Sequence, residues 1–276
     1  MGVSRNEFIR LTGMTGLAAS MAPLEAIHSL DGIGAKLNLG LASYTLRNFN
    51  VDYVISVCKK LELKSVSLKS FHLPLDSNPE KIKEVTEKIR NNGIDVYGAG
   101  VIYMKTEQEV LNAFAYAKHG GFKMIIGVPD HSLLPFVNDV VKEGDIKLAI
   151  HNHGPEDKLY PGVGAVHEKI KDLDSRIGYC IDIGHVTRNG QDAAAMIKKY
   201  KDRLFDIHMK DVDAKTGDGV PVEVGHGVIN IPGVLKTLKK VAYTGTVAFE
   251  YEKDGEDPLA GLAESVGYTR GVLKMI

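Results

Sequence analysis

The chain has 276 residues, of which 44% are hydrophobic and 25% charged, and its formal net charge is -1. These values are ordinary for a globular protein and fit one large domain. The balance of 34 basic against 35 acidic residues argues against binding nucleic acid through its phosphates. No segment approaches the ~20 apolar residues that a membrane span requires, and two isolated cysteines, Cys58 and Cys180, exclude a disulfide framework.

The first thirty residues differ in character from the rest. A short basic start with Arg5 and Arg10 leads into a stretch of small and apolar residues, which is the layout of an export signal. It resembles a twin-arginine signal in which Asn6 occupies the position of the second arginine. Residues 1–30 are therefore either an export signal, which implies a periplasmic protein, or an N-terminal helix of a cytoplasmic one.

From residue 36 onward, short apolar runs alternate with longer segments whose apolar residues follow helical spacing. The predicted strands are residues 37–42, 65–68, 94–99, 123–128, 147–151, 177–183, 204–209 and 246–251. The clearest predicted helices are residues 51–61, 79–92, 107–119 and 192–201, and a last helix, 258–274, follows the eighth strand. Eight strand–helix alternations predict a single-domain (β/α)8 TIM barrel over residues 36–276. An open doubly wound sheet is the alternative, but residues 42–47 lack the glycine-rich phosphate turn expected after its first strand.

Histidines gather at the ends of the predicted strands. Six of the ten lie at or just beyond a C-terminal strand end: His72, His131, His151, His153, His185 and His208. In a barrel these ends meet on one face, where active sites are built. Scattered histidines of a hydrophobic core would not be distributed in this way.

The alternation of side chains along a strand separates inward from outward positions. In the last four strands, bulky apolar residues share the face that would pack against the outer helices. The opposite face carries small or polar residues, among them His151, His153, Asp182, His208, Lys210, Glu250 and Glu252. Four consecutive strands therefore offer an imidazole or a carboxylate to the inside of the barrel.

Buried imidazoles and carboxylates need partners, because burying them unpaired costs several kcal/mol each. One divalent metal ion would satisfy four such groups together. Two histidines and two carboxylates, here His151, Asp182, His208 and Glu250, suit Mn²⁺, Co²⁺, Zn²⁺ or Fe²⁺. The alternative is a set of hydrogen-bonded pairs without a metal, such as His208 with Asp182.

The same residues carry a resemblance to a known family. The segments 181–185 (IDIGH), 206–211 (DIHMKD), 225–230 (GHGVIN) and 249–252 (FEYE), with the opening 40–47 (GLASYTLR), resemble those of the xylose isomerase-like TIM barrels. That family includes ketose 3-epimerases, inosose dehydratases, hydroxypyruvate isomerase and apurinic endonucleases. The last group looks a poor match, because its members need additional ligands for three zinc ions.

The resemblance implies a ligand set for one metal ion. Family members hold the metal through a glutamate after strand five, the aspartate of D-x-G-H, the histidine of H-x-K-D and a glutamate after strand eight. Asp182, His208 and Glu250 match three of these positions. Where relatives often read Glu-Asn-His, this chain reads HNH at residues 151–153, so His151 takes the fourth place, with His153 as the alternative. The resemblance also implies that His185 contacts a substrate oxygen.

Proton abstraction next to a carbonyl is the chemistry that such a site supports. The expected function is isomerisation or epimerisation of a small sugar or polyol through an enediolate, with Glu250 as the base and His151 or His153 as the opposing acid or base. A lyase or dehydratase acting on a keto-sugar or inosose is the second possibility, and a non-catalytic sugar-binding barrel is the third. Loss of the strand-five glutamate slightly favours the lyase.

Other polar residues at the same strand ends are candidates for substrate binding: Lys210, Arg47, His72 and Glu156. Lys210 could equally pair with Asp182 or Glu252. Arg47, His72 and Glu156 could also be solvated loop residues, and Lys69 and His131 are weaker candidates. The loop over residues 211–229, the longest irregular stretch, could contribute to specificity or to contact with a second copy of the chain in a homo-oligomer.

Overall fold

The computed structural model describes residues 2–7 and 36–276. The predicted export signal or N-terminal helix over residues 1–30 therefore lies largely outside the described residues. The short described segment lies against helix α4 (Glu107–Gly120). There the Val3 backbone accepts from Gln108 Nε2 (2.6 Å) and donates to Asn112 Oδ1 (3.0 Å).

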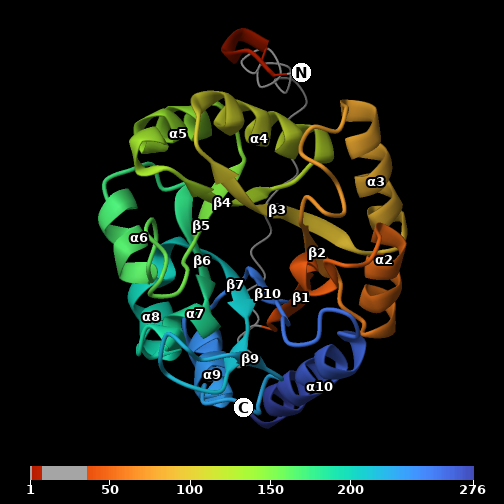
Figure 1. Ribbon diagram of the computed structural model, residues 1–276, viewed down its shortest axis with the longest axis vertical. Helices are drawn as coiled ribbons and strands as arrows, with labels where there is room; N and C mark the ends of the chain where they lie inside the picture. The colour runs from red at the N-terminus through yellow and green to blue at the C-terminus, as the bar shows by residue number, and fades with distance from the viewer. Residues whose placement is uncertain (1, 8–35) are drawn as a thin grey trace, which may run out of the picture.

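Eight parallel strands form a closed barrel, which confirms the predicted (β/α)8 fold. Around the barrel the order is β1, β10, β7, β6, β5, β4, β3, β2, and helices surround the strands in the view of Figure 1. The strands are β1 (Asn38–Ala42), β2 (Ser65–Leu68), β3 (Asp95–Met104), β4 (Met124–Pro129), β5 (Lys147–His151), β6 (Ile177–Asp182), β7 (Leu204–Met209) and β10 (Thr246–Phe249).

Several helices begin where a side chain accepts from the free N–H groups of the first turn. Asn50, Asn78, Asp192 and Asn230 cap α2, α3, α8 and α9 in this way. The α-helices are α2 (Val51–Lys60), α3 (Pro79–Asn91), α4, α5 (Leu134–Val140), α6 (Val163–Ile170), α7 (Ile183–Arg188), α8 (Ala193–Tyr200), α9 (Ile231–Lys240) and α10 (Leu259–Met275). Within the described part of the chain, none of them combines the length and the apolar character needed to cross a bilayer.

Two separate hydrophobic cores confirm the predicted alternation of faces. The large core lies between strands and helices and includes outward residues such as Ile150, Ile181 and Phe249. The small one fills the barrel interior with Ala42, Tyr97, Met124, Ile126, Ala149, Cys180 and Ala248. The inward residues of the last strands are small, so there is room for the polar side chains at the C-terminal ends of these strands.

One strand runs further than the sequence predicts. β3 continues to Met104, five residues beyond the expected end, and its register against β4 shifts between Gly100 and Ile102. Glycines at 98 and 100 look like a strand end, since glycine weakens a strand and often marks an irregularity. The extension carries Tyr103 to the mouth of the barrel.

The loop over residues 211–229 also contains structure. Two short antiparallel strands, β8 (Asp211–Val212) and β9 (Pro221–Val222), pair within it. The buried Asp211 carboxylate accepts from the backbone N–H groups of Gly225, Gly227 and Ile229 at 2.9 to 3.2 Å. The aspartate of the H-x-K-D segment therefore fixes the shape of this loop.

Candidate metal centre

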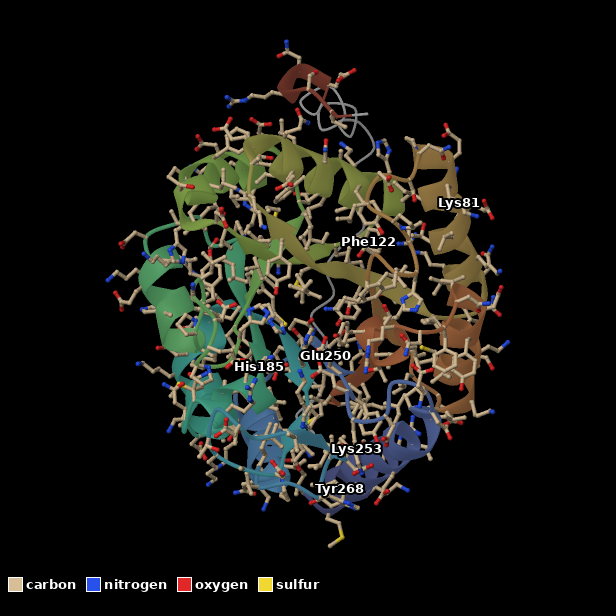
Figure 2. All side chains as sticks on the ribbon, viewed as in Figure 1. Lys81, Phe122, His185, Glu250, Lys253 and Tyr268 are labelled. Atoms are coloured by element: carbon tan, nitrogen blue, oxygen red, sulfur yellow. The ribbon has the colours of Figure 1, made fainter. Side chains whose placement is uncertain are left out.

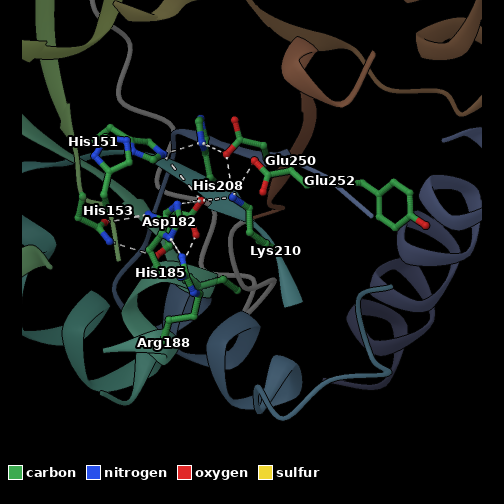
Figure 3. Close-up of polar contacts among 12 residues, drawn as sticks. His151, His153, Asp182, His185, Arg188, His208, Lys210, Glu250 and Glu252 are labelled. Atoms are coloured by element: carbon green, nitrogen blue, oxygen red, sulfur yellow. Dashed lines mark hydrogen bonds and ion pairs between the residues drawn. The ribbon is translucent and has the colours of Figure 1, made fainter. Parts of the chain in front are cut away.

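Four side chains from consecutive strands converge inside the mouth of the barrel. His151, Asp182, His208 and Glu250 each offer one ligand atom, and these atoms all lie within 4.8 Å of one another. His208 Nδ1 lies 3.1 Å from His151 Nε2 and 3.0 Å from Glu250 Oε2, while His151 Nε2 is 3.8 Å from Asp182 Oδ2. All four side chains are buried, and Figure 3 shows them turned toward one another.

The spacing and the chemistry of these atoms fit one divalent cation. Ligand atoms at bond lengths of ~2.1 Å lie roughly 3.0 to 3.4 Å apart around a metal in octahedral or tetrahedral geometry. Two of the three separations given above fall in this range. Asp182 Oδ2 is buried and lies 2.9 Å from Lys210 Nζ, although that contact lacks the geometry of a well-formed hydrogen bond. A cation between the four side chains would give this carboxylate oxygen a further partner.

The D-x-G-H segment, residues 182–185, forms the junction between β6 and α7, and the contacts there account for its aspartate and its glycine. Asp182 ends the strand and caps the helix, because its Oδ1 accepts from the His185 backbone N–H at 2.9 Å. Its Oδ2 is thereby directed into the cluster. A Cβ atom at Gly184 would come within 2.8 Å of the Lys210 side chain, so the lysine can lie beside Asp182 only because residue 184 is glycine.

Asn152 holds the ends of β5 and β6 together. Its Oδ1 accepts from the Asp182 backbone N–H at 3.0 Å and its Nδ2 donates to the Asp182 carbonyl at 3.3 Å. The side chain thus continues the ladder between the strands that carry His151 and Asp182. Its role was not predicted, because parity places residue 152 on the outward face.

Two lysines neutralise the carboxylates of the site. Lys210 Nζ lies 2.9 Å from Asp182 Oδ2, 3.2 Å from Glu250 Oε2 and 3.2 Å from Glu252 Oε1. Lys69 Nζ lies 3.5 Å from Glu250 Oε1. Burial opposes the charge on Lys210, but the three carboxylates around it raise its pKa well above the usual value. Lys210 therefore stays cationic beside the cluster.

Burial and neighbouring charges set the protonation of the other groups. Burial lowers the pKa of His151 well below its ordinary value and that of His185 to about 4, so both imidazoles are neutral near pH 7. Burial opposes the ionisation of Glu250, but His208 and Lys210 hold its pKa well below the usual range. A neutral His151 and an ionised Glu250 are in the forms that bind metal ions. At His208 burial opposes the charged form, but Glu250 outweighs it and raises the pKa of the imidazole, so a bound metal ion would displace its proton.

A cavity of about 450 Å³ opens beside the cluster. Its lining includes His151, His153, His185 and Glu250, with Lys69, Glu252 and three aromatic side chains, Tyr44, Phe71 and Tyr103. Phe71 and Tyr103 are 57% and 52% exposed, so they form part of its open rim. In Figure 2, His185 and Glu250 lie near the centre of the molecule, whereas Lys81 and Tyr268 lie at its edge.

The aromatic lining does not follow from the polar residues at the strand ends, on which the sequence-based prediction of the site rests. Tyr44 and Phe71 follow β1 and β2, as the histidines follow later strands. Applying the same strand-end criterion to aromatic residues would have found these two. Tyr103 could not be found in this way, because β3 was predicted to end at residue 99.

The remaining predicted residues lie around this centre at different distances from the cavity. His72 is buried between the first two loops, where its ring contacts Ser43 Oγ and the Leu46 carbonyl, each at 3.0 Å. Arg47 lies over the Tyr44 ring, 5.0 Å from its centroid, and Glu156 pairs with Arg188 at 3.0 Å. None of these three belongs to the described lining of the cavity. Their part in substrate binding stays a prediction.

His131 is also separate from the cluster. Its Nε2 donates to the Leu159 carbonyl at 2.9 Å, and its ring packs edge-on against Tyr160. These contacts give His131 a structural role in the loop after β4.

Comparison with known proteins agrees with this architecture. The model of the xylose isomerase-like TIM barrel family matches residues 134–272, half of the chain. The chain belongs to this family. The matched half contains the last four barrel strands and all four residues of the cluster, so the resemblance predicted from the sequence is confirmed.

Curated relatives of this xylose isomerase-like barrel align with it over part of their length. An uncharacterized protein of Methanocaldococcus jannaschii is 25% identical over 73% of this chain and 69% of its own. The rhizopine catabolism protein MocC of Rhizobium meliloti is 26% identical over 46% of each chain. An inosose dehydratase of Clostridium perfringens is 29% identical over 42% of this chain and 43% of its own. The chain thus spans less than half of the last two relatives.

Solved structures share the fold over nearly the whole described barrel. An L-ribulose 3-epimerase superposes with a TM-score of 0.70 at 12% identity, covering 87% of this chain and 95% of its own. A 3-keto-D-glucoside 4-epimerase of Escherichia coli gives a TM-score of 0.69 at 14% identity, covering 86% and 100%. At such identities the likeness establishes the fold alone.

Proposed function

We propose that this protein is a metal-dependent isomerase or epimerase of a small sugar or polyol that abstracts a proton next to a carbonyl. The observation that supports it is the placement of two groups able to transfer protons on opposite sides of the cluster. Glu250 follows β10, while His151 and His153 come from β5 and the loop after it, three strands away around the barrel. Figure 3 has His153 and Glu250 on opposite sides of Asp182 and His208.

His151, Asp182, His208 and Glu250 would hold one divalent ion, of Mn, Co, Zn or Fe. Such an ion supplies Lewis-acid stabilisation of the negative charge that develops on substrate oxygens. Glu250 would serve as the base for the substrate C–H, because its Oε1 is directed toward Lys69 at the cavity wall. Lys210 would keep Glu250 ionised until it takes the proton, and His153 would act on the opposite face of the substrate.

The second candidate is a dehydratase or lyase acting on a keto-sugar or an inosose. It begins with the same proton abstraction but expels a leaving group from the next carbon. Two observations favour it: His151 replaces the glutamate that the family often has after strand five, and inosose dehydratases are among the curated relatives. With Asp182 committed to capping α7 and to Lys210, Glu250 is the one cluster carboxylate left to act as a base.

Metal content and isotope exchange test the proposal. The purified full chain should contain, or take up, about one Mn²⁺, Co²⁺ or Zn²⁺ per molecule, and Asp182→Ala should lose it. Ketopentoses, ketohexoses and inososes incubated with the loaded protein in D₂O should be recovered with deuterium next to the carbonyl. Formation of an unsaturated ketone with loss of water would instead support the dehydratase. A protein that takes up no divalent metal would refute both.

The base is tested separately. Glu250→Gln should lower turnover by at least on the order of a hundredfold, the usual contribution of general base catalysis. Glu168→Gln is the matched control, since Glu168 is an exposed carboxylate on α6 that pairs with Lys171 at the surface. Full turnover in Glu250→Gln would exclude Glu250 as the base.

A further inference from the structure

Besides His151, two histidines line the cavity, His153 and His185, and they have different surroundings. Their ring centroids are 5.6 Å apart, and both side chains are largely buried. A neutral imidazole carries one N–H donor and one acceptor, and the contact made by one nitrogen decides what the other presents. The groups behind each ring therefore determine what each histidine presents to a bound substrate.

His185 is oriented by an arginine. Arg188 Nη1 lies 3.3 Å from His185 Nδ1, and a guanidinium group can only donate hydrogen bonds. Nδ1 must therefore be the acceptor, which leaves the ring hydrogen on Nε2. That nitrogen lies 3.9 Å from Asp182 Oδ2, on the side of the cluster. Arg188 is itself held by the Gly217 carbonyl, which accepts from its Nε at 3.1 Å.

His153 has the opposite arrangement. Its Nδ1 faces Asp157 Oδ2 at 3.4 Å, a contact without the geometry of a well-formed hydrogen bond. The negative charge of the carboxylate still favours the ring hydrogen on the nitrogen that faces it, Nδ1. Its Nε2 is then the acceptor for the Tyr103 hydroxyl, 3.1 Å away. Asp157 is fixed by the loop after β5, because its Oδ1 accepts from the backbone N–H groups of Leu159 and Tyr160 at 2.8 and 2.7 Å.

We propose that Arg188 and Asp157 are positioning residues that hold His185 and His153 in opposite tautomers, so that His185 presents a donor to the substrate and His153 presents an acceptor to Tyr103. The chemical roles rest on the proposed function, whereas the tautomers are a property of the resting protein. His185 Nε2–H donates to a substrate oxygen at the cluster. Tyr103, at the rim of the cavity, connects His153 to the substrate.

Near His153, a proton can pass from the substrate through Tyr103 to the imidazole. A substrate hydroxyl gives its proton to the Tyr103 oxygen as Tyr103 gives its own proton to His153 Nε2. His153 then carries the positive charge beside the Asp157 carboxylate, and the substrate carries the negative charge. Reversal returns both protons. This chain of three residues lies across the cluster from Glu250 and supplies a second proton-transfer group, which acts on a substrate hydroxyl while Glu250 acts on the C–H.

Nitrogen NMR of the full chain labelled with ¹⁵N-histidine, prepared with and without Zn²⁺, reads the tautomers directly. The two signals are assigned by their loss in His153→Gln and His185→Gln. We expect the unprotonated, downfield nitrogen to be Nδ1 in His185 and Nε2 in His153. The same tautomer in both rings, or the reverse of either, overturns the inference whatever the activity.

Asp157→Asn provides the sharpest variant. The asparagine Oδ1 can keep both backbone hydrogen bonds, so the amide group replaces Oδ2 and donates to His153 Nδ1. The tautomer of His153 should then invert while that of His185 stays unchanged. Arg188→Met should release His185 alone, and Arg188→Lys should restore its tautomer. Asp174→Asn, which alters a distant aspartate paired with Arg176, should change neither ring.

Turnover distinguishes the inference from the function on which it rests. On any substrate that passes the exchange test, Asp157→Asn should lower kcat on the order of a hundredfold or more, with KM little changed. Wild-type turnover in Asp157→Asn with an inverted His153 tautomer would overturn the proposed proton transfer through Tyr103 to His153. Tautomers as expected in a protein that converts none of the sugars would refute the proposed function while supporting the tautomer assignment.

Discussion

A buried carboxylate below the cluster makes stability depend on pH in a direction that can be calculated. Asp206 is fully buried in the barrel, where both its oxygens accept from the Tyr97 hydroxyl at 3.1 Å and its Oδ2 lies 3.6 Å from His208 Nε2. Burial raises the pKa of Asp206 to about 7, although His208 and Tyr97 act in the opposite direction. We consider the replacement Asp206→Asn, which keeps the shape and an acceptor for Tyr97 but cannot ionise.

The magnitude follows from proton linkage. In the unfolded chain an aspartate has a pKa of about 3.9, so between about pH 4 and pH 7 the folded protein binds a proton that the unfolded chain has released. The free energy of unfolding therefore falls as pH rises through this window and is constant above it. Between pH 5 and pH 7 the loss is two pH units at ~1.36 kcal/mol each, or about 2.7 kcal/mol. The Asn variant lacks this loss.

Urea unfolding followed by circular dichroism measures the effect. Wild type and Asp206→Asn are compared at pH 5 and pH 8 in the presence of a chelator, so that metal binding at His208 does not contribute. The variant should gain about 2.7 kcal/mol relative to wild type between the two pH values, because groups that do not contact Asp206 titrate alike in the two proteins. A difference that is the same at both pH values, or that favours wild type at pH 8, would refute the reasoning.

Three further predictions concern metal binding, the loop and a helix start. Mn²⁺ or Zn²⁺ at a hundred times its Kd should stabilise the fold by about 2.7 kcal/mol, seen as a rise of several degrees in Tm that Asp182→Ala lacks. Gly227→Ala would make a Cβ overlap Asp211 Oδ1; a loss of about 1 to 3 kcal/mol in urea unfolding is expected, and an unchanged midpoint would contradict the packing. Thr106→Ala should cost about 1 kcal/mol, because Thr106 and Glu109 form a reciprocal capping box at α4; an unaltered midpoint would show that the box is dispensable.

The fold could be predicted because each of its signals is local. Apolar runs and helical spacing located all eight barrel strands, and parity placed Asp182, His208 and Glu250 on the inner face before any contact was known. Prediction failed where long-range contacts decide. Residues 100–104 extend β3 because β4 offers an edge beyond the shifted register, and Asn152 points sideways to β6 rather than outward. Neither the length of β3 nor the direction of the Asn152 side chain is determined by the residues adjacent in the sequence.

The site was predictable in its centre and less so in its surroundings. Strand ends meet by topology, so the cluster follows from the strand positions alone. The partners behind the histidines do not follow from topology, although they are near in sequence: Arg188 is three residues from His185 and Asp157 is four residues from His153. Strand positions do not fix the direction of side chains in the helix and loops that follow. For the same reason Arg47 and His72, predicted from strand ends, lie beside the cavity lining, where Arg47 contacts Tyr44 and His72 contacts Ser43 and Leu46.

Asp211 anchors the loop after β7, so the turn over residues 213–220 can vary in sequence independently of the strand that carries His208. Asp211 fixes residues 225–229, and β8 and β9 close a turn over residues 213–220. Substitutions or insertions at that turn would leave the strand that carries His208 undisturbed. The candidate metal centre can thus be inherited intact while the turn diversifies, so related barrels could vary this turn without rebuilding the cluster.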